Sequence, residues 1–240
     1  MKKPISKFFL EIASIVIGIT ISFLLEDSRQ KQELKSLSDD LKLNLLNEVY
    51  EIEKYVENRE NAYNGDKLIL EILMNRNANL DSLLNQVTRK SKFINPIFGY
   101  RGFQPPTSFY KSLVNDGKIR YLESTELKKE LDLMHSVNTY YIRENIKDEV
   151  IAERKIIDYF EKNYPKDYIA SGNNSIKTED FVKKIYERIQ TDDQLKAMMF
   201  QKISSMKIKI SFFNKYKNSL LKLKFILSSQ TKKDTLLYDD

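Results

Sequence analysis

The most apolar stretch of the chain is residues 8–25, which carry a single charged side chain, Glu11. Eighteen residues form a helix of about 27 Å, close to the hydrocarbon thickness of a bilayer, about 30 Å. Three lysines precede the stretch and two acids follow it. The pattern predicts one membrane-spanning helix. A cleaved signal peptide is disfavoured because no small-x-small site follows, and a buried helix of a soluble protein stays an alternative.

Beyond residue 25, apolar side chains recur every three or four positions, which is typical of amphipathic helices. Asn64 and Gly65 predict a turn, and the other ends are predicted from caps, prolines and glycines. The expected elements are a helix over residues 26–63, a short helix around residues 68–73, helices capped by Asn79 and Thr107, a long helix from Ser124 or Thr125 to Asn163, a helix capped by Thr178, and a last helix from Thr191 to about Ser228.

Only six glycines occur in 240 residues, and no alternating β-branched runs accompany them. We therefore predict an all-α protein, in which one N-terminal transmembrane helix continues into an elongated antiparallel helical bundle. The expected division is a basic tail (1–7), the transmembrane helix (8–25), a soluble helical bundle (26–230) and a flexible tail (231–240).

Two segments interrupt the helical pattern. Residues 164–177 are predicted to be a loop, and residues 93–107 hold three of the five prolines together with several aromatic side chains. Such an aromatic loop either packs across the bundle or contacts a protein partner. The candidate partner residues are Phe98, Tyr100, Arg101 and Phe103.

Within the apolar stretch, Ser14, Gly18 and Ser22 recur every four residues, and Glu11 lies on the same side of a helix. Small residues at this spacing let two helices approach closely in lipid. The stripe predicts a self-association face or the lining of a pore. Glu11 also lies four residues after Lys7, so a simple ion pair that reaches toward the headgroups is an alternative role.

Charge is distributed unevenly along the chain. Residues 26–60 contain ten acidic and six basic side chains, whereas residues 194–233 contain ten lysines and no acid. The basic segment could bind nucleic acid, anionic lipid or the acidic helix. Nucleic acid is disfavoured because arginine is absent there, and we favour antiparallel packing against the acidic helix. The lysines of this basic helix are Lys202, Lys207, Lys209, Lys215, Lys217, Lys222 and Lys224.

Catalytic chemistry has little support in the residues. The chain has no cysteine and one histidine, His135, whose neighbours Asp132 and Ser136 predict a solvated face. A lone histidine without cysteine is not a metal site, and no nucleotide- or calcium-binding loop occurs. We expect no catalytic residue, cofactor or metal, and an enzyme using His135 is the weakest alternative.

Two blocks resemble a known family. Glu11, Ile12, Val16, Gly18 and Ile19, with an acidic exit at Glu26 and Asp27, resemble the N-terminus of an uncharacterised family of small single-pass inner-membrane helical proteins of Bacteroidota. Residues 107–131 resemble its second block at Ser112, Gly117, Ile119 and Leu127. The likeness covers roughly 60 of 240 residues, and Phe23, Leu24 and Leu25 stand where that family often has Trp and Asn. The resemblance implies an inner-membrane helical protein and no activity.

These patterns predict a non-enzymatic, membrane-anchored interaction or scaffold protein that forms homo-oligomers and holds an unidentified protein partner. The alternative is a pore-forming oligomer, such as an effector of antiviral defence. The lysines before the apolar stretch favour a cytoplasmic N-terminus with a periplasmic bundle.

Overall fold

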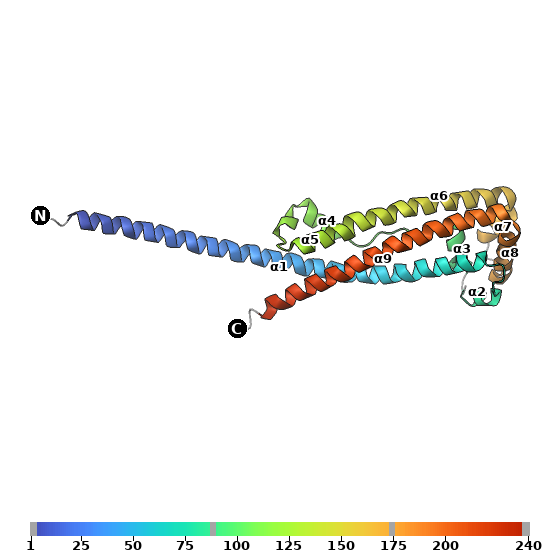
Figure 1. The fold of residues 1–240 in the computed structure, drawn as a ribbon, viewed down its shortest axis with the longest axis horizontal. Coiled ribbons are helices and arrows are strands. Elements are labelled where there is room, and N and C mark those ends of the chain that lie inside the picture. Colours follow the sequence, from blue (N-terminus) through green and yellow to red (C-terminus); the bar gives the residue numbers. More distant parts are fainter. Residues whose placement is uncertain (1–3, 87–89, 173–175, 237–240) are drawn as a thin grey trace.

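The computed structural model describes residues 4–86, 90–172 and 176–236, with side chains except at 4–9, 82, 86 and 230–236. Every regular element in this described part of the chain is helical, which confirms the all-α prediction. Three long helices form the frame: α1 (Pro4–Met74), α6 (Thr139–Asn163) and α9 (Asp193–Leu236). Helix α9 packs against both α1 and α6 and runs antiparallel to them, as the bundle prediction requires (Figure 1).

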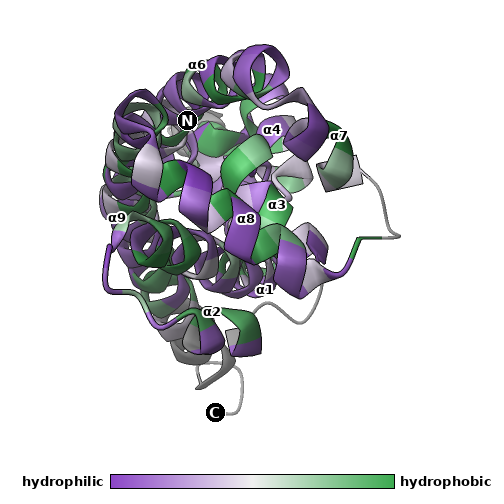
Figure 2. Cartoon of the chain, turned by 90° about the vertical axis from the view of Figure 1, so that its right-hand side faces the viewer, coloured by the Kyte–Doolittle hydropathy of each residue, from purple (hydrophilic) through white to green (hydrophobic). Residues whose placement is uncertain are grey.

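Shorter helices close the two ends of this frame. Helices α2 (Leu80–Gln86), α3 (Lys90–Phe98), α7 (Pro165–Gly172) and α8 (Thr178–Thr191) gather at the end away from the N-terminus. Figure 2 looks onto that end. Toward the other end lie α4 (Ser108–Asn115), the 3₁₀ turn η1 (Lys118–Tyr121) and α5 (Thr125–Asp132), which leads into a π-helical turn, η2 (Leu133–Asn138).

The buried apolar side chains form two clusters along the bundle. The first joins the middle of α1 to α5, α6 and the second half of α9, and includes Leu45, Leu131 and Phe213. The second joins the end of α1 to α3, α8 and the first half of α9. The same face of α9 completes both clusters, so the helix positions the two halves of the bundle relative to each other.

The predicted helix end at Asn64-Gly65 is wrong. Helix α1 continues through both residues to Met74 and buries Leu70 and Leu73 in the second cluster. A glycine inside a helix costs only about 1 kcal/mol relative to alanine. Burial of two leucines contributes more than that, at about 1.5–3 kcal/mol each. Tertiary packing therefore overrides the local turn signal.

Both predicted loops contain helix. Helix α3 covers residues 90–98 despite Pro96, because Phe93, Pro96 and Ile97 are buried; only residues 99–107 of that prediction are irregular. Helix α7 occupies residues 165–172 of the other predicted loop. It begins with Pro165, a residue favoured in the first helical turn, so a start signal was present in the sequence.

Local cap chemistry predicts several ends correctly. The side chains of Asn79 and Ser124 accept hydrogen bonds from the backbone N–H groups of Asp81 and Leu127. Helix α4 begins directly after Thr107, as predicted, but the Thr107 side chain makes no cap hydrogen bond. Two other caps differ. The N-cap of α8 is Lys177 rather than Thr178. The last helix is capped by the Asp192 carboxylate, which accepts from the N–H groups of Gln194 and Leu195, instead of by Thr191.

The long helix expected up to Asn163 contains the π turn η2 in its first half. The extra residue per turn rotates the apolar face, so Met134, Asn138 and Ile142 are buried while Val137 and Tyr141 are exposed. A regular α-helix would instead have placed Val137 and Tyr141 on the same face as Met134. Helix α9 extends to Leu236, beyond its predicted end, and residues 237–240 of the predicted tail lie outside the described residues.

Alanine substitutions at two glycines test whether α1 is continuous through Gly65 and whether Gly117 has a left-handed backbone conformation. Gly65 is exposed inside α1, and a Cβ there would meet nothing within 4 Å, whereas Gly117 has φ +64°. We expect Gly65→Ala to raise the free energy of unfolding by about 0.5–1 kcal/mol, because the unfolded chain loses conformational freedom. Gly117→Ala should lower it by about 1 kcal/mol or more. Urea titrations of both variants measure the two signs, and a destabilised Gly65→Ala protein would contradict a continuous α1.

Candidate functional site

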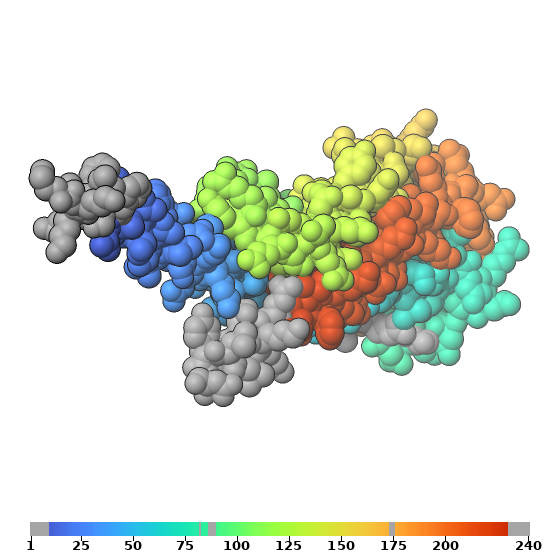
Figure 3. All heavy atoms as spheres, turned by 60° about the vertical axis from the view of Figure 1, so that its left-hand side comes forward, coloured from blue at the N-terminus to red at the C-terminus, as the bar shows by residue number. Residues whose placement is uncertain are grey.

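The N-terminal part of α1 projects from the bundle as a single helix (Figure 3). Every described side chain from residue 10 to residue 36 is exposed. Between residues 10 and 25 these exposed side chains include large apolar groups on all sides of the helix: Leu10, Ile12, Ile15, Val16, Ile17, Ile19, Ile21, Phe23, Leu24 and Leu25. An apolar surface this extensive marks a contact with another protein or with a membrane.

A polar collar follows the apolar segment. The Arg29 guanidinium contacts the carboxylates of Glu26 at 2.8 Å and Glu33 at 3.0 Å, and Lys31 contacts Asp27 at 2.6 Å. All of these groups are well exposed. Exposed pairs of this kind add little stability. They show that the helix surface changes from apolar to charged within one turn, at Glu26 and Asp27.

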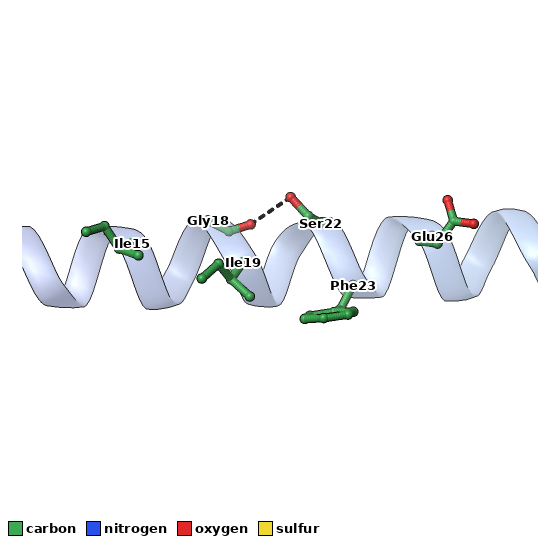
Figure 4. A pocket seen from close by; sticks show the side chains of 6 residues that line it. All are labelled: Ile15, Gly18, Ile19, Ser22, Phe23 and Glu26. Carbon is green, nitrogen blue, oxygen red and sulfur yellow. Dashed lines mark hydrogen bonds between the residues drawn. The ribbon is translucent and has the colours of Figure 1, made fainter.

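The small-residue stripe forms one flat side of this helix. The Ser14 hydroxyl donates to the Glu11 carbonyl oxygen and the Ser22 hydroxyl to the Gly18 carbonyl oxygen, each at 2.9 Å. The serines therefore satisfy their hydroxyls within the helix and present little polarity to a neighbour. A shallow hollow follows the stripe, lined by Ile15, Gly18, Ile19, Ser22, Phe23 and Glu26 (Figure 4).

The structure thus places Gly18 and Ser22 in the hollow, one turn apart, while Glu11 and Ser14 lie further toward the N-terminus of the same helix. The alternative ion pair between Glu11 and Lys7 cannot be placed, because the Lys7 side chain lies outside the described part of the structure. Phe8 and Phe9, at the start of the predicted span, also have side chains outside the described residues.

In the part of the chain that the structure describes, no helix combines the length and the apolar character needed to cross a membrane. Comparisons with protein-family models, with curated proteins and with solved structures find no match for this chain. The resemblance to the Bacteroidota family and the membrane span therefore both stay predictions.

The candidate partner loop is largely packed into the bundle. Phe103 is buried, with its ring 4.9 Å from that of Tyr216, and Phe98 stacks edge-on against Phe160 at the same distance. Arg101 forms a two-pronged ion pair with Asp66 of α1. Tyr100 is the exposed member of the four, so packing is the main role of this loop in the structure.

The basic helix contacts the acidic helix, as favoured from the charge pattern. Lys217 contacts Glu60 at 2.6 Å, Lys224 contacts Glu53 at 2.7 Å, and Lys207 contacts Glu71 at 3.2 Å. These three pairs join α9 to α1 in antiparallel order. Of the remaining exposed lysines, Lys222 contacts Glu130 of α5, and the Lys215 ammonium lies over the Phe212 ring.

Lys202 and Lys209 are fully buried, which the sequence pattern did not reveal. Lys209 pairs with the buried carboxylate of Glu149 on α6, and its ammonium lies 4.2 Å from the centre of the Tyr63 ring. Lys202 donates to the carbonyl oxygens of Ile97 at 2.9 Å and Gly99 at 2.7 Å. Burial lowers the pKa of Lys202 to about 8 and also lowers the pKa of Lys209.

His135 occupies a position different from the predicted solvated face. It lies in the π turn, its ring stacks on that of Tyr110 at 3.9 Å, and its Nδ1 is buried with no hydrogen-bond partner among the described residues. Burial lowers the pKa of His135 to about 3. The ring is therefore neutral at physiological pH and has no carboxylate aimed at it that would make it a general base.

Breaking the buried ion pair between Lys209 and Glu149 should destabilise the protein much more than breaking an exposed ion pair. Glu149→Leu leaves the Lys209 ammonium buried without its counter-charge, so we expect the free energy of unfolding to fall by about 3–5 kcal/mol. Adding Lys209→Met should restore most of the loss. Glu60→Leu, which breaks the half-exposed Lys217 pair, is the matched control and should cost about 1 kcal/mol or less. Equal effects of Glu149→Leu and Glu60→Leu in urea titrations would contradict burial of the pair.

A second prediction concerns pH. The unfolded chain protonates His135 near pH 6.5, whereas the folded protein does so only near pH 3. The unfolded state therefore binds more protons as the pH falls below 6.5, and stability decreases by up to about 1.4 kcal/mol per pH unit toward pH 3. This loss should be absent in His135→Phe. Since His135 is the single histidine, its ring resonances can be followed by NMR, and a midpoint near 6.5 in the folded protein would refute the prediction.

Proposed function

We propose that this protein is a non-enzymatic, membrane-anchored helical interaction protein that self-associates through the N-terminal part of α1. The observation that supports the proposal most directly is the exposure of the apolar side chains between residues 10 and 25 on every side of the helix. No described part of the bundle covers them.

Lipid is the environment that suits all sides of such a helix at once. A large apolar side chain gains about 1.5–3 kcal/mol when it leaves water completely, and ten such side chains are exposed in this segment. The helical backbone satisfies its own hydrogen bonds, which is required in a hydrocarbon environment. The charged collar from Glu26 to Glu33 would then lie in the headgroup region and the adjacent water.

Self-association is supported by the shape of one side of the helix. Between helices in lipid, close approach of backbones contributes more than apolar area does. Gly18 and Ser22 leave a hollow bordered by Ile15, Ile19 and Phe23, which could receive the same side of a second copy. A homo-oligomer would hold several bundles side by side at the membrane, ready to bind a protein partner.

The proposed location is the inner membrane, with the N-terminus in the cytoplasm and the bundle in the periplasm. The lysines ahead of the apolar segment support this orientation. The polar stalk over residues 26–36 would hold the bundle about 16 Å beyond the hydrocarbon, at about 1.5 Å per residue.

The anchor can be tested by carbonate extraction of membranes that contain the full-length chain. We expect the protein to stay with the membranes after washing at high pH. Release into the supernatant would contradict anchoring by an inserted helix.

The association face can be tested by crosslinking in the same membranes. Gly18→Leu fills the hollow and should reduce crosslinked oligomers about tenfold or more, since a clash costs more than 1.4 kcal/mol. Thr20→Leu, on the opposite side of the helix, is the matched control and should leave the oligomers unchanged. Oligomers that persist in Gly18→Leu would exclude this face as the interface.

A further inference from the structure

A small cavity lies where the N-terminus of α4 meets the π turn η2 and the start of α6. Its volume is about 80 Å³, and the lining residues that matter are Thr107, Tyr110, Lys111, His135, Thr139 and Arg143. A water molecule needs about 10–15 Å³ measured in this way. The cavity therefore has room for a compact group of about five heavy atoms, the size of a phosphate or of a carboxylate with its attached carbon.

His135 forms part of the cavity wall, and the Tyr110 ring holds the imidazole in a stacked position. Its Nδ1 is closed off from solvent and has no hydrogen-bond partner among the described residues, which is uncommon for a buried polar atom. A π turn is itself costly and is found frequently at functional sites.

Thr107 contributes a hydroxyl that its own helix does not use. Thr107 is the N-cap residue of α4, yet its side chain makes no cap hydrogen bond. The Glu48 carboxylate of α1 takes this role and accepts from the N–H groups of Phe109 at 2.6 Å and Tyr110 at 3.1 Å. Glu48 is therefore committed to the backbone, and the Thr107 hydroxyl can donate to a group in the cavity.

The charged side chains of the lining are both cationic. Lys111 and Arg143 are exposed residues that line the cavity, and neither forms an ion pair with a described carboxylate. Burial raises the pKa of the Glu48 carboxyl group, while the nearby Lys111 ammonium acts to lower it. Two cations beside a hydroxyl donor disfavour a metal ion and favour an anion.

We propose that this cavity binds the oxyanion of a phosphate or carboxylate group between Lys111 and Arg143, with the Thr107 hydroxyl donating a hydrogen bond to it and the His135 ring forming part of the wall. The Arg143 guanidinium supplies the planar fork that matches two oxygens of such a group. The inference is independent of the membrane anchor, since the cavity is formed entirely by the bundle.

The single histidine makes the test specific. The chain with isotope-labelled histidine shows only His135 ring signals, and these report on the cavity that His135 lines. Inorganic phosphate is titrated in one arm and acetate in the other, with ionic strength held constant by sodium chloride. We expect a saturable shift of the His135 signals in at least one arm, and the arm that saturates identifies the group. Absence of a saturable shift in both arms would overturn the proposal.

Variants distinguish a specific anion-binding site from nonspecific attraction of anions to a basic protein. Lys111→Gln with Arg143→Gln should weaken binding about tenfold or more, because two charge-assisted contacts are lost. Arg154→Gln with Lys155→Gln removes the same charge from two equally exposed positions on α6 that do not line the cavity, and it should have no effect. Thr107→Val keeps the charge and should also weaken binding. Equal affinities in the two double variants would mean an adventitious ion only.

Discussion

Helix α9 packs along α1 and α6 over most of its length, and each hydrophobic cluster of the bundle is completed by its side chains. Leu195, Lys202, Lys209, Tyr216 and Leu223 repeat at intervals of seven residues, and all five are buried. Two members of an otherwise apolar stripe are therefore lysines. Removing α9 would expose both clusters at once and would take away the counter-charge of Glu149.

Along α9, Lys209 lies between the residues of the two clusters, and Lys202 lies within the stretch that belongs to the second cluster. Lys209 pairs with Glu149, Lys202 satisfies the carbonyl groups at the end of α3, and Arg101 pairs with Asp66 nearby in the same bundle. An apolar contact tolerates a shift of α9 by one turn, but a buried charge does not, since it would lose its partner. These polar contacts therefore fix the register of α9 against α1 and α6, while the surrounding leucines, isoleucines and phenylalanines supply most of the stability.

Helix α1 joins two different environments without a break. Its first described part has apolar side chains on every side and no contact with the bundle, whereas its last thirty or so residues are packed against α9, α3 and the end helices. The charged collar between them carries its ion pairs within the helix. The exposed apolar segment is therefore joined to the bundle by a continuous helix rather than by a flexible linker. Pairing of this segment with a second copy would fix the position of the bundle as well.

The sequence by itself determined the helical class, the apolar segment near the N-terminus, the caps at Asn79 and Ser124 and the attraction between the acidic and basic helices. These features depend on side chains a few residues apart or on the sum of many charges, so they can be recognised without coordinates. Only the tertiary structure decided that α1 continues through Gly65, that Lys202 and Lys209 are buried, and that a carboxylate 61 residues away caps α4. Each of these depends on contacts between distant segments, and their energy exceeds the roughly 1 kcal/mol carried by a local turn or cap signal.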